Sequence, residues 1–287
     1  MCKLGIAIFS FNRPNYLQKV LNSLKNNDLT NADLWFWQDG SVNMYSKKRY
    51  VDNDIIHQCI KQFEQTFPQT QYSIKWKTPP EWNVGPGIKQ YLAGKKMFER
   101  YDRVLFLEDD MIISNDYVRL IQILLDQFAS DRQVGTVQCA YKDYFHPTKE
   151  NLHKVRKGWQ GGVHFWGYAT WKDRWLDMEK WFVENYYPFI KDIDYRDRPI
   201  NQIREMYKRR GIVEDVSSQD AAKKWGFHQQ HPIRIVTGVR RAKYIGEKGL
   251  HETPDQFKKS EYGKVGSIVN IPEYERWIRE FKEIIKV

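Results

Sequence analysis

The sequence predicts an α/β fold in which a mostly parallel central sheet is flanked by helices. Three observations predict it. Short apolar runs alternate with segments of helical periodicity, and the apolar runs end in polar or glycine-rich residues. The 287 residues are enough for a substantial buried core, and 41% hydrophobic with 29% charged residues is a globular balance.

The first expected strand covers residues 3–11, whose near-continuous apolar run is typical of a strand buried on both faces. A helix is predicted after Asn12-Arg13-Pro14, because apolar side chains then recur every three or four positions. Further strands are expected at 34–38, 72–77, 103–107 and 134–140, with helices after residue 87 and at roughly 116–129. This alternation favours parallel strands joined by helices.

The formal net charge of +10 is spread unevenly, with a positive surplus of two in residues 1–150 and of eight in residues 151–287. A basic second half predicts an anionic partner, such as nucleic acid, a phosphate-bearing lipid or a charged glycan. Cys2, Cys59 and Cys139 lie too far apart for a disulfide framework, which favours a reducing compartment. The longest early apolar run has eight residues, too few for a transmembrane segment, so we expect a cytoplasmic protein.

The strongest chemical signal is the run Glu108-Asp109-Asp110 at the end of a predicted strand. Three consecutive carboxylates repel one another, and burying them without a counter-ion costs several kcal/mol. A hard divalent cation, Mg²⁺ or Mn²⁺, relieves that conflict together with phosphate oxygens. A solvated acidic turn, or an acidic start of the following helix, is the alternative interpretation.

Polar residues follow several of the predicted strands directly. Arg13, Asp39 and residues 108–110 each come after a strand. In an open parallel sheet, ligands bind beyond the carboxyl ends of the strands. We therefore expect one crevice to collect these side chains.

Four motifs resemble those of a known enzyme group. Residues 104–114 resemble the aspartate-rich metal motif of GT-A glycosyltransferases, and the likeness is closest to the N-acetylglucosaminyltransferase I-like group. Gln38-Asp39-Gly40 resembles the uracil-binding strand end of that group, and Arg13 lies where the group has a donor-binding arginine. Residues 245–251, followed by 255–257, resemble its late glycine-rich loop. The resemblance implies the Rossmann-like GT-A form of the predicted fold.

The resemblance also implies roles on the donor side. Asp110 would bind a divalent metal, Mn²⁺ or Mg²⁺, that bridges the two phosphates of a nucleoside-diphosphate sugar. Glu108 and Asp109 would hold the ribose or assist the metal. Asp39 would accept a hydrogen bond from the uracil N–H, and Arg13 would assist in donor binding.

Three further positions belong to this prediction. His251 would be a second metal ligand or a phosphate contact, with a surface-loop histidine as the alternative. Gly85, in the glycine-rich turn 83–87, and Trp166, in the Gly- and Trp-rich stretch 158–171, are assigned to donor binding. Glycines let backbone amides approach a ligand, and flat aromatic rings stack on sugars or bases. Core packing is the alternative for most of these tryptophans.

An inverting transfer also needs a base within reach of the acceptor hydroxyl. Residues 217–225 predict a capped helix start with Asp220 in its first turn. In the resembling enzymes an acidic residue at such a helix start deprotonates the acceptor, which makes Asp220 the first candidate and Asp215 the second. Compensation of the helix dipole, worth about 0.3–1 kcal/mol, is the alternative for Asp220.

The sequence thus predicts a metal-dependent glycosyltransferase that moves a sugar from a nucleoside-diphosphate donor, with uridine as the expected base, to a hydroxyl with inversion. The acceptor would be a glycan or lipid-linked saccharide, or a hydroxylated base in DNA. Residues 1–145 would form the nucleotide-sugar-binding subdomain, and 146–287 a continuous acceptor-binding subdomain. Its closing helix at 272–286 would dock on the protein or contact a membrane surface. The rival function is a non-catalytic sugar- or nucleic-acid-binding protein.

Overall fold

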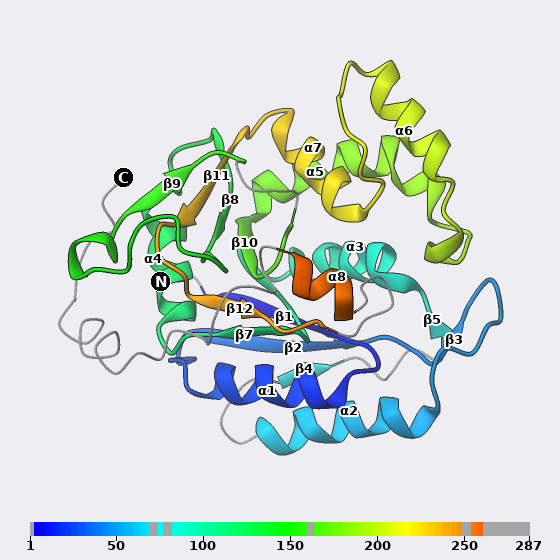
Figure 1. Ribbon diagram of the computed structural model, residues 1–287, viewed down its shortest axis with the longest axis horizontal. Coiled ribbons are helices and arrows are strands. Elements are labelled where there is room, and N and C mark those ends of the chain that lie inside the picture. The colour runs from blue at the N-terminus through cyan, green and yellow to red at the C-terminus, as the bar shows by residue number, and fades with distance from the viewer. Residues whose placement is uncertain (1–2, 69–73, 77–81, 160–163, 248–253, 261–287) are drawn as a thin grey trace.

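The computed structural model describes residues 3–68, 74–76, 82–159, 164–247 and 254–260. Its centre is an eight-stranded sheet with helices on both faces (Figure 1). From one edge of the sheet to the other, the strands are β4 (Ile74–Trp76), β2 (Ala32–Gln38), β1 (Leu4–Ser10), β6 (Arg103–Glu108), β10 (Tyr168–Trp171), β8 (Val134–Gln138), β11 (Ile233–Thr237) and β9 (Val155–Lys157).

The sheet is mostly parallel. β4, β2, β1 and β6 pair in parallel, and β8 and β11 run in the same direction as these four. β10, between β6 and β8, and β9 at the edge run the opposite way. The predicted α/β class with a mostly parallel central sheet is confirmed. The antiparallel strand β10 was not expected, because its sequence lies in the aromatic-rich second half, where the strand–helix alternation stops.

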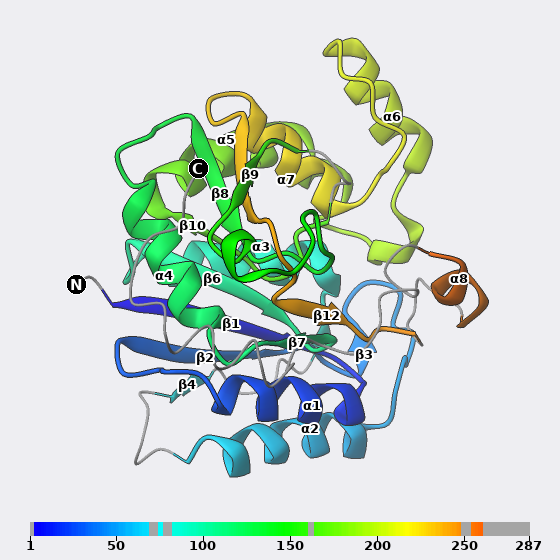
Figure 2. The same cartoon turned by 60° about the vertical axis from the view of Figure 1, so that its left-hand side comes forward.

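Two layers of helices cover the sheet, as both views of the ribbon show (Figures 1 and 2). The helices of one layer are α1 (Pro14–Lys25), α2 (Asn53–Thr66) and α4 (Tyr117–Gln127). Those of the other layer are α3 (Gly85–Met97), α5 (Lys172–Asn185) and α7 (Gln219–His228). The remaining helices are α6 (Ile200–Arg209), α8 (Pro254–Lys259) and the 3-10 turns η1 (Lys149–Asn151), η2 (Tyr187–Phe189) and η3 (Tyr195–Asp197). None of the helices in the described ranges is long and apolar enough to cross a membrane.

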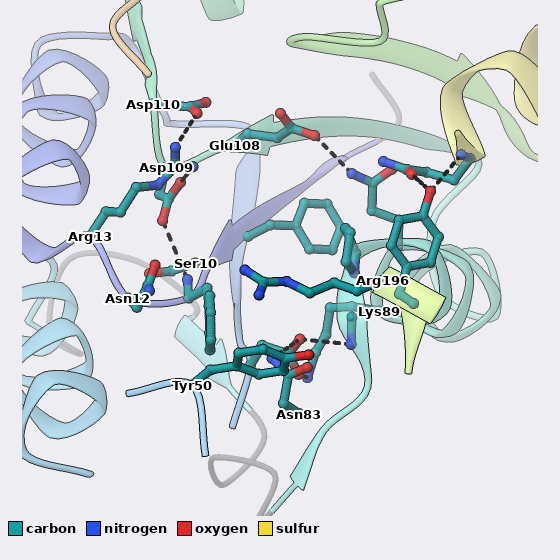
Figure 3. A pocket seen from close by; sticks show the side chains of 18 of the residues that line it. Ser10, Asn12, Arg13, Tyr50, Asn83, Lys89, Glu108, Asp109, Asp110 and Arg196 are labelled. Carbon is teal, nitrogen blue, oxygen red and sulfur yellow. Dashed lines mark hydrogen bonds and ion pairs between the residues drawn. The ribbon is translucent and has the colours of Figure 1, made fainter. Parts of the chain in front are cut away.

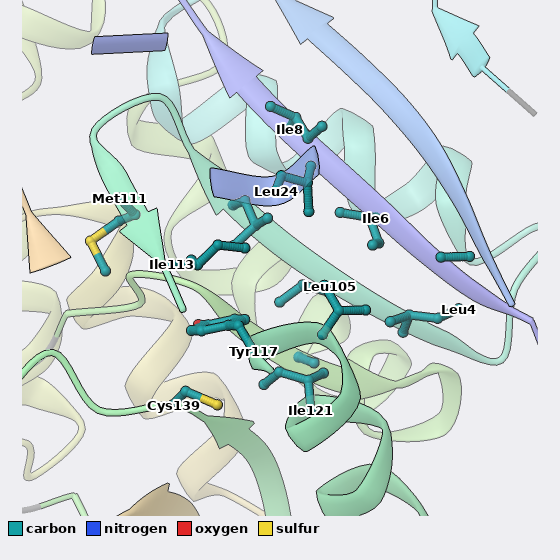
Figure 4. Packing of buried hydrophobic residues seen from close by; sticks show 14 of the residues in the cluster. Leu4, Ile6, Ile8, Leu24, Leu105, Met111, Ile113, Tyr117, Ile121 and Cys139 are labelled. Carbon is teal, nitrogen blue, oxygen red and sulfur yellow. The ribbon is translucent and has the colours of Figure 1, made fainter. Parts of the chain in front are cut away.

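The apolar run of β1 explains why this strand lies in the middle of the protein. All seven of its residues are buried. Ile6 and Ile8 pack into the core cluster on the α1 face, and Ala7 and Phe9 pack into the cluster on the opposite face. Figure 4 shows Ile6 and Ile8 in the first cluster, of which Tyr117 of α4 is another member. A strand whose alternate side chains enter two cores needs apolar residues at every position.

Two short pairs of strands flank the carboxyl edge of the main sheet. β7 (Met111–Ile113) pairs with β12 (Ala242–Tyr244) directly after the acidic run of β6. β3 (Val42–Asn43) pairs with β5 (Trp82–Asn83) after the end of β2. These pairs bring late and early segments of the chain to the ends of the central strands. The closing helix expected at 272–286 lies outside the described residues.

Candidate active site

Polar residues at the carboxyl ends of β1, β2 and β6 line one pocket, together with residues at the start of α3, around η3 and in β12 (Figure 3). Seven of the residues predicted from the sequence lie in its wall: Arg13, Asp39, Gly85, Glu108, Asp109, Asp110 and Trp166. The carboxyl ends of parallel neighbours lie at one edge of the sheet, so the expected crevice forms there.

Arg13 is the first counter-ion of the acidic run. Its Nη1 lies 2.7 Å from Asp110 Oδ2, and its Nη2 pairs with Asp109 Oδ1. Burial alone lowers the pKa of Arg13, but the carboxylates of Asp109 and Asp110 outweigh it and raise that pKa above its ordinary value. The backbone N–H of Phe11 donates to Asp109 Oδ2 at 3.3 Å. A divalent metal was expected to neutralise these carboxylates, whereas Arg13 of the chain itself supplies part of the neutralising charge.

Asp110 has the features of a metal ligand. Its side chain is buried, which raises its pKa to about 6 although Arg13 lowers it. Its Oδ1 atom receives no hydrogen bond from the described residues. A buried carboxylate oxygen without a donor is the type of ligand that Mg²⁺ and Mn²⁺ take. Among the described residues, no group of three or more His, Cys, Asp or Glu is placed to hold a metal ion.

The segment after β12 passes directly over Asp110. The N–H of Ile245 donates to the carbonyl oxygen of Asp110 at 2.8 Å. A Cβ atom on Gly246 would lie 2.7 Å from Asp110 Oδ2, so only glycine allows this close approach of the backbone. The first part of the predicted glycine-rich loop therefore lies at the acidic run.

Glu108, which is half-buried, ends a polar chain of four side chains whose other three members are buried. Gln90 Nε2 of α3 donates to Glu108 Oε1 at 2.8 Å, and Lys223 Nζ of α7 donates to Gln90 Oε1 at 2.5 Å. Lys223 Nζ also lies 2.9 Å from Asp220 Oδ1. Burial raises the pKa of Glu108 to about 8, and the charges of Asp110 and Asp220 add to this effect. The chain joins the pocket wall to the interior of the α3–α7 layer.

Asp39 is tied to the turn that starts α3. Its Oδ1 accepts from the N–H groups of Gly40 and Val84, at 3.2 and 3.1 Å, and its Oδ2 accepts from the N–H of Gly85 at 3.0 Å. Asn83 Nδ2 donates to Oδ2 at 2.9 Å, and Lys89 Nζ lies 3.3 Å from Oδ1. A carboxylate has about four lone-pair sites. A uracil N–H could bind this side chain only if one of its protein partners moved away.

Arg196, the middle residue of η3, lines the same pocket (Figure 3). Its guanidinium stacks on the ring of Tyr50 at 4.6 Å and makes no ion pair with a described carboxylate. Its backbone N–H donates to Asp194 Oδ1 at 3.1 Å, and the other oxygen of Asp194 accepts from the hydroxyls of Ser46 and Tyr50. The pocket therefore contains a positioned cation whose charge is available to a ligand.

Aromatic rings form another part of the wall. Trp166 stacks between His164, at 4.0 Å between ring centroids, and Tyr244, at 4.2 Å. Tyr141 meets Trp166 edge-on at 5.2 Å. Trp166 is itself buried, so it supports the wall through Tyr244 in addition to any contact with a ligand.

No protein-family model and no curated protein matches the chain. Similar solved structures include Staphylococcus aureus TarS 1–349 in complex with UDP-GlcNAc, at 12% identity over 97% of this chain and 65% of that one, with a TM-score of 0.47. Another is the mannosyltransferase PcManGT from Pyrobaculum calidifontis in complex with GDP-Man and Mn²⁺, at 12% identity over 87% and 59%, with a TM-score of 0.48. The chain spans less than two thirds of the length of either. At these values neither similarity assigns a ligand or an activity to this chain.

Two of the predicted site residues that the structure describes, Asp220 and Asp215, do not line the pocket. Asp220 is buried in the first turn of α7, where Ser218 caps the helix as expected and the N–H of Phe165 donates to Asp220 Oδ2 at 3.3 Å. Asp215 is exposed, and its carbonyl oxygen accepts from Arg204 Nε at 2.9 Å. His251 lies outside the described residues. The residues expected on the donor side therefore line one pocket, whereas Asp220 and Asp215, the two candidate bases, lie outside its wall.

Several polar side chains of the pocket were not assigned from the sequence: Tyr50, Asn83, Lys89, Gln90, Arg196 and Tyr244. Lys89 and Gln90 had a usable signal, because they are polar residues on the first turns of a helix that follows a glycine-rich turn. Arg196 had none. It lies in a short 3-10 turn that Asp194 ties to Ser46 and Tyr50, far away in the sequence.

Proposed function

We propose that this protein is a metal-dependent glycosyltransferase. It transfers a sugar from a nucleoside-diphosphate donor, with uridine as the base, to a hydroxyl group with inversion. The observation that carries the proposal is Asp110, a buried carboxylate with one oxygen that no described residue donates to, paired with Arg13 and covered by Gly246 at the carboxyl edge of the sheet. Edges of this type are where α/β proteins bind nucleotides.

The charge balance of the pocket supports a divalent cation. Its lining residues include five carboxylates and three cations: Asp39, Glu108, Asp109, Asp110 and Asp194 against Arg13, Lys89 and Arg196. A bound cation favours the ionised forms of Glu108 and Asp110, whose pKa values are raised in the metal-free pocket. With all eight groups ionised, the pocket has a surplus of two negative charges, which one Mn²⁺ or Mg²⁺ would neutralise. When bound, such an ion acts as a Lewis acid that stabilises the departing diphosphate. Asp110 would hold it, and Asp109, fixed by Arg13 and Phe11, would assist.

Three other residues of the pocket have roles in binding the diphosphate, shaping the base end and supporting the wall. Arg196 is the cation for the diphosphate, because its guanidinium stacks on Tyr50 and pairs with no carboxylate among the described residues. Asp39 fixes the Gly85 turn and Lys89, and through them shapes the base end of the pocket, rather than binding the base itself. Trp166 supports the wall beside the sugar.

The acceptor is proposed to be anionic, because the basic surplus lies in residues 151–287. α6, which follows η3, carries Arg204, Lys208 and Arg209. A glycan or lipid-linked saccharide and a hydroxylated base in DNA remain the two candidates. Binding of duplex DNA would weaken steeply with salt, because displaced counter-ions set the affinity. We place the protein in the cytoplasm, where free buried thiols such as Cys59 stay reduced.

A thermal-shift screen of nucleotides tests the proposal. We expect UDP and UDP-sugars to raise the melting temperature with Mn²⁺ and much less with EDTA, because a ligand that binds only the folded state stabilises it. Asp110→Ala should remove the metal-dependent part, whereas Glu99→Gln, an exposed control, should keep it. If no nucleoside diphosphate stabilises the wild type with Mn²⁺, the proposal is wrong. Binding without consumption of any nucleotide sugar would favour the non-catalytic alternative.

A further inference from the structure

The buried chain from Asp220 to Glu108 has a fixed direction. The ammonium of Lys223 can only donate, so it must face the carbonyl oxygen of Gln90. The same amide then has only N–H donors left for its other neighbour, and its Nε2 meets Glu108 Oε1 at 2.8 Å. The charge on Lys223 therefore decides which atom of Gln90 faces the pocket, although 133 positions separate these two residues in the sequence.

The interior holds this chain in one arrangement. Lys223 is 3% exposed and Gln90 is 7% exposed. Besides Asp220, the ammonium faces the rings of Phe165 and Tyr168, at 4.6 and 5.1 Å. A buried charge that lost its partner would be costly, and the close-packed surroundings leave little room for other rotamers. Rotation of the Gln90 amide would place its N–H₂ group against the ammonium, so that orientation is excluded as well.

The chain makes the two carboxylate oxygens of Glu108 different in their hydrogen bonding. Oε1 is fixed by Gln90, whereas no hydrogen bond from the described residues reaches Oε2. Glu108 is a pocket-lining residue, and Figure 3 shows it at the end of β6 with its dashed contact toward α3. Asp220, at the opposite end of the chain, does not line the pocket. Of the two carboxylates joined by the chain, one is therefore placed to touch a substrate.

We infer that Gln90, Lys223 and Asp220 are positioning residues that hold Glu108 so that its Oε2 faces a substrate hydroxyl and forms a hydrogen bond with it. The inference rests on the proposed function, because the hydroxyl belongs to a nucleotide sugar or to its acceptor. It gives Asp220 a role as the charge partner of Lys223 in place of proton abstraction. Asp220 acts on the substrate only through three intervening side chains.

A double-mutant cycle between Gln90 and Glu108 tests the inference. Gln90→Met keeps the shape of the side chain and removes both hydrogen bonds. We expect it to lower kcat/KM for consumption of a UDP-sugar with Mn²⁺ about 10- to 100-fold, the effect of losing a hydrogen bond to a charged group. In a Glu108→Ala background the same change should alter kcat/KM less than about twofold, because the group being positioned is gone.

Asn185→Leu is the matched control, since it removes another buried amide, one that bonds within α5. Its effect on kcat/KM should be small and equal in both backgrounds. The free energies of unfolding of the same variants, measured in urea without metal, should also show coupling between positions 90 and 108. Additive effects in either measurement overturn the inference. If the wild type neither binds nor consumes a nucleotide sugar, the proposed function is wrong, and the urea cycle still decides whether the two side chains are coupled.

Discussion

The ammonium of Lys223 lies 2.9 Å from the carboxylate of Asp220, and both residues are buried. A buried ion pair of this kind is weak evidence for stability, because removing two charges from water costs about as much as their attraction returns. Removing one partner is different, because it leaves a buried charge uncompensated. The pair therefore makes the α3–α7 layer sensitive to single substitutions at either position.

Lys223→Met is expected to lower the free energy of unfolding by about 3–5 kcal/mol. The neighbouring Lys224→Met is the control, because Lys224 is partly exposed and pairs with Glu214 at 3.3 Å, a contact worth about 0–1 kcal/mol. Replacing both partners, as in Asp220→Asn with Lys223→Met, should cost less than Lys223→Met alone. Urea unfolding gives the free energy of unfolding of the wild type and of the three variants. Equal losses for Lys223→Met and Lys224→Met would contradict the prediction.

Asp220→Asn separates the positioning role from the role of a base. If Asp220 acts through Lys223, then Asp220→Asn and Lys223→Met should reduce turnover of a UDP-sugar to similar extents, and both should lower the melting temperature. A base would instead give a turnover loss of orders of magnitude for Asp220→Asn with an unchanged melting temperature. Asp215→Asn should leave both quantities unchanged, since Asp215 is exposed and does not line the pocket.

The raised pKa of Glu108, about 8 against an ordinary value of 4.5, predicts a pH dependence of stability. The folded protein binds this proton more tightly than the unfolded chain does. The contribution of Glu108 to the stability of the metal-free protein is therefore fully present below pH 4.5 and is lost as the pH rises through about 8. Glu108→Gln cannot lose a proton, so its stability relative to the wild type should increase between pH 5 and pH 8.5. Urea midpoints measured with EDTA test this, and parallel curves for the two proteins would refute it.

Arg196→Ala is expected to weaken UDP binding about 10- to 100-fold, because a charged donor to the diphosphate is lost. Uridine has no phosphate, so its affinity should not change. Arg209→Ala is the control, because Arg209 is an exposed arginine on α6 that pairs with Glu205. Isothermal titration with Mn²⁺ measures each affinity. A similar loss for UDP and uridine would mean that Arg196 shapes the pocket without binding phosphate.

The sequence was sufficient for the parts of the site that depend on strand ends. The apolar run of β1 and the acids after β6 place Arg13 and Asp110 at one edge, because parallel neighbours end together. The start of α7 was also predictable from its cap. The orientation of the Asp220 side chain was not predictable. It depends on Lys223, Gln90 and the N–H of Phe165, which only the fold brings together.

The hydrogen-bond partners of Asp39 were likewise not predictable from the sequence. A carboxylate after a strand indicates an acceptor for a ligand, but the backbone N–H groups of Val84 and Gly85 take up that capacity here. These donors belong to every non-proline residue and therefore leave no mark in the sequence. Gly85 itself was assigned to the donor site, and its φ of +78° is the conformation that such a turn requires.

β10 joins β6 to β8 by hydrogen bonds on both of its edges. β8 comes from the first half of the chain, yet both strands beside it, β10 and β11, come from the second. A truncated first half would expose two bare edges of β8, which invite aggregation. We therefore expect the two halves to melt in a single transition, and to be inherited together rather than exchanged as separate modules by recombination.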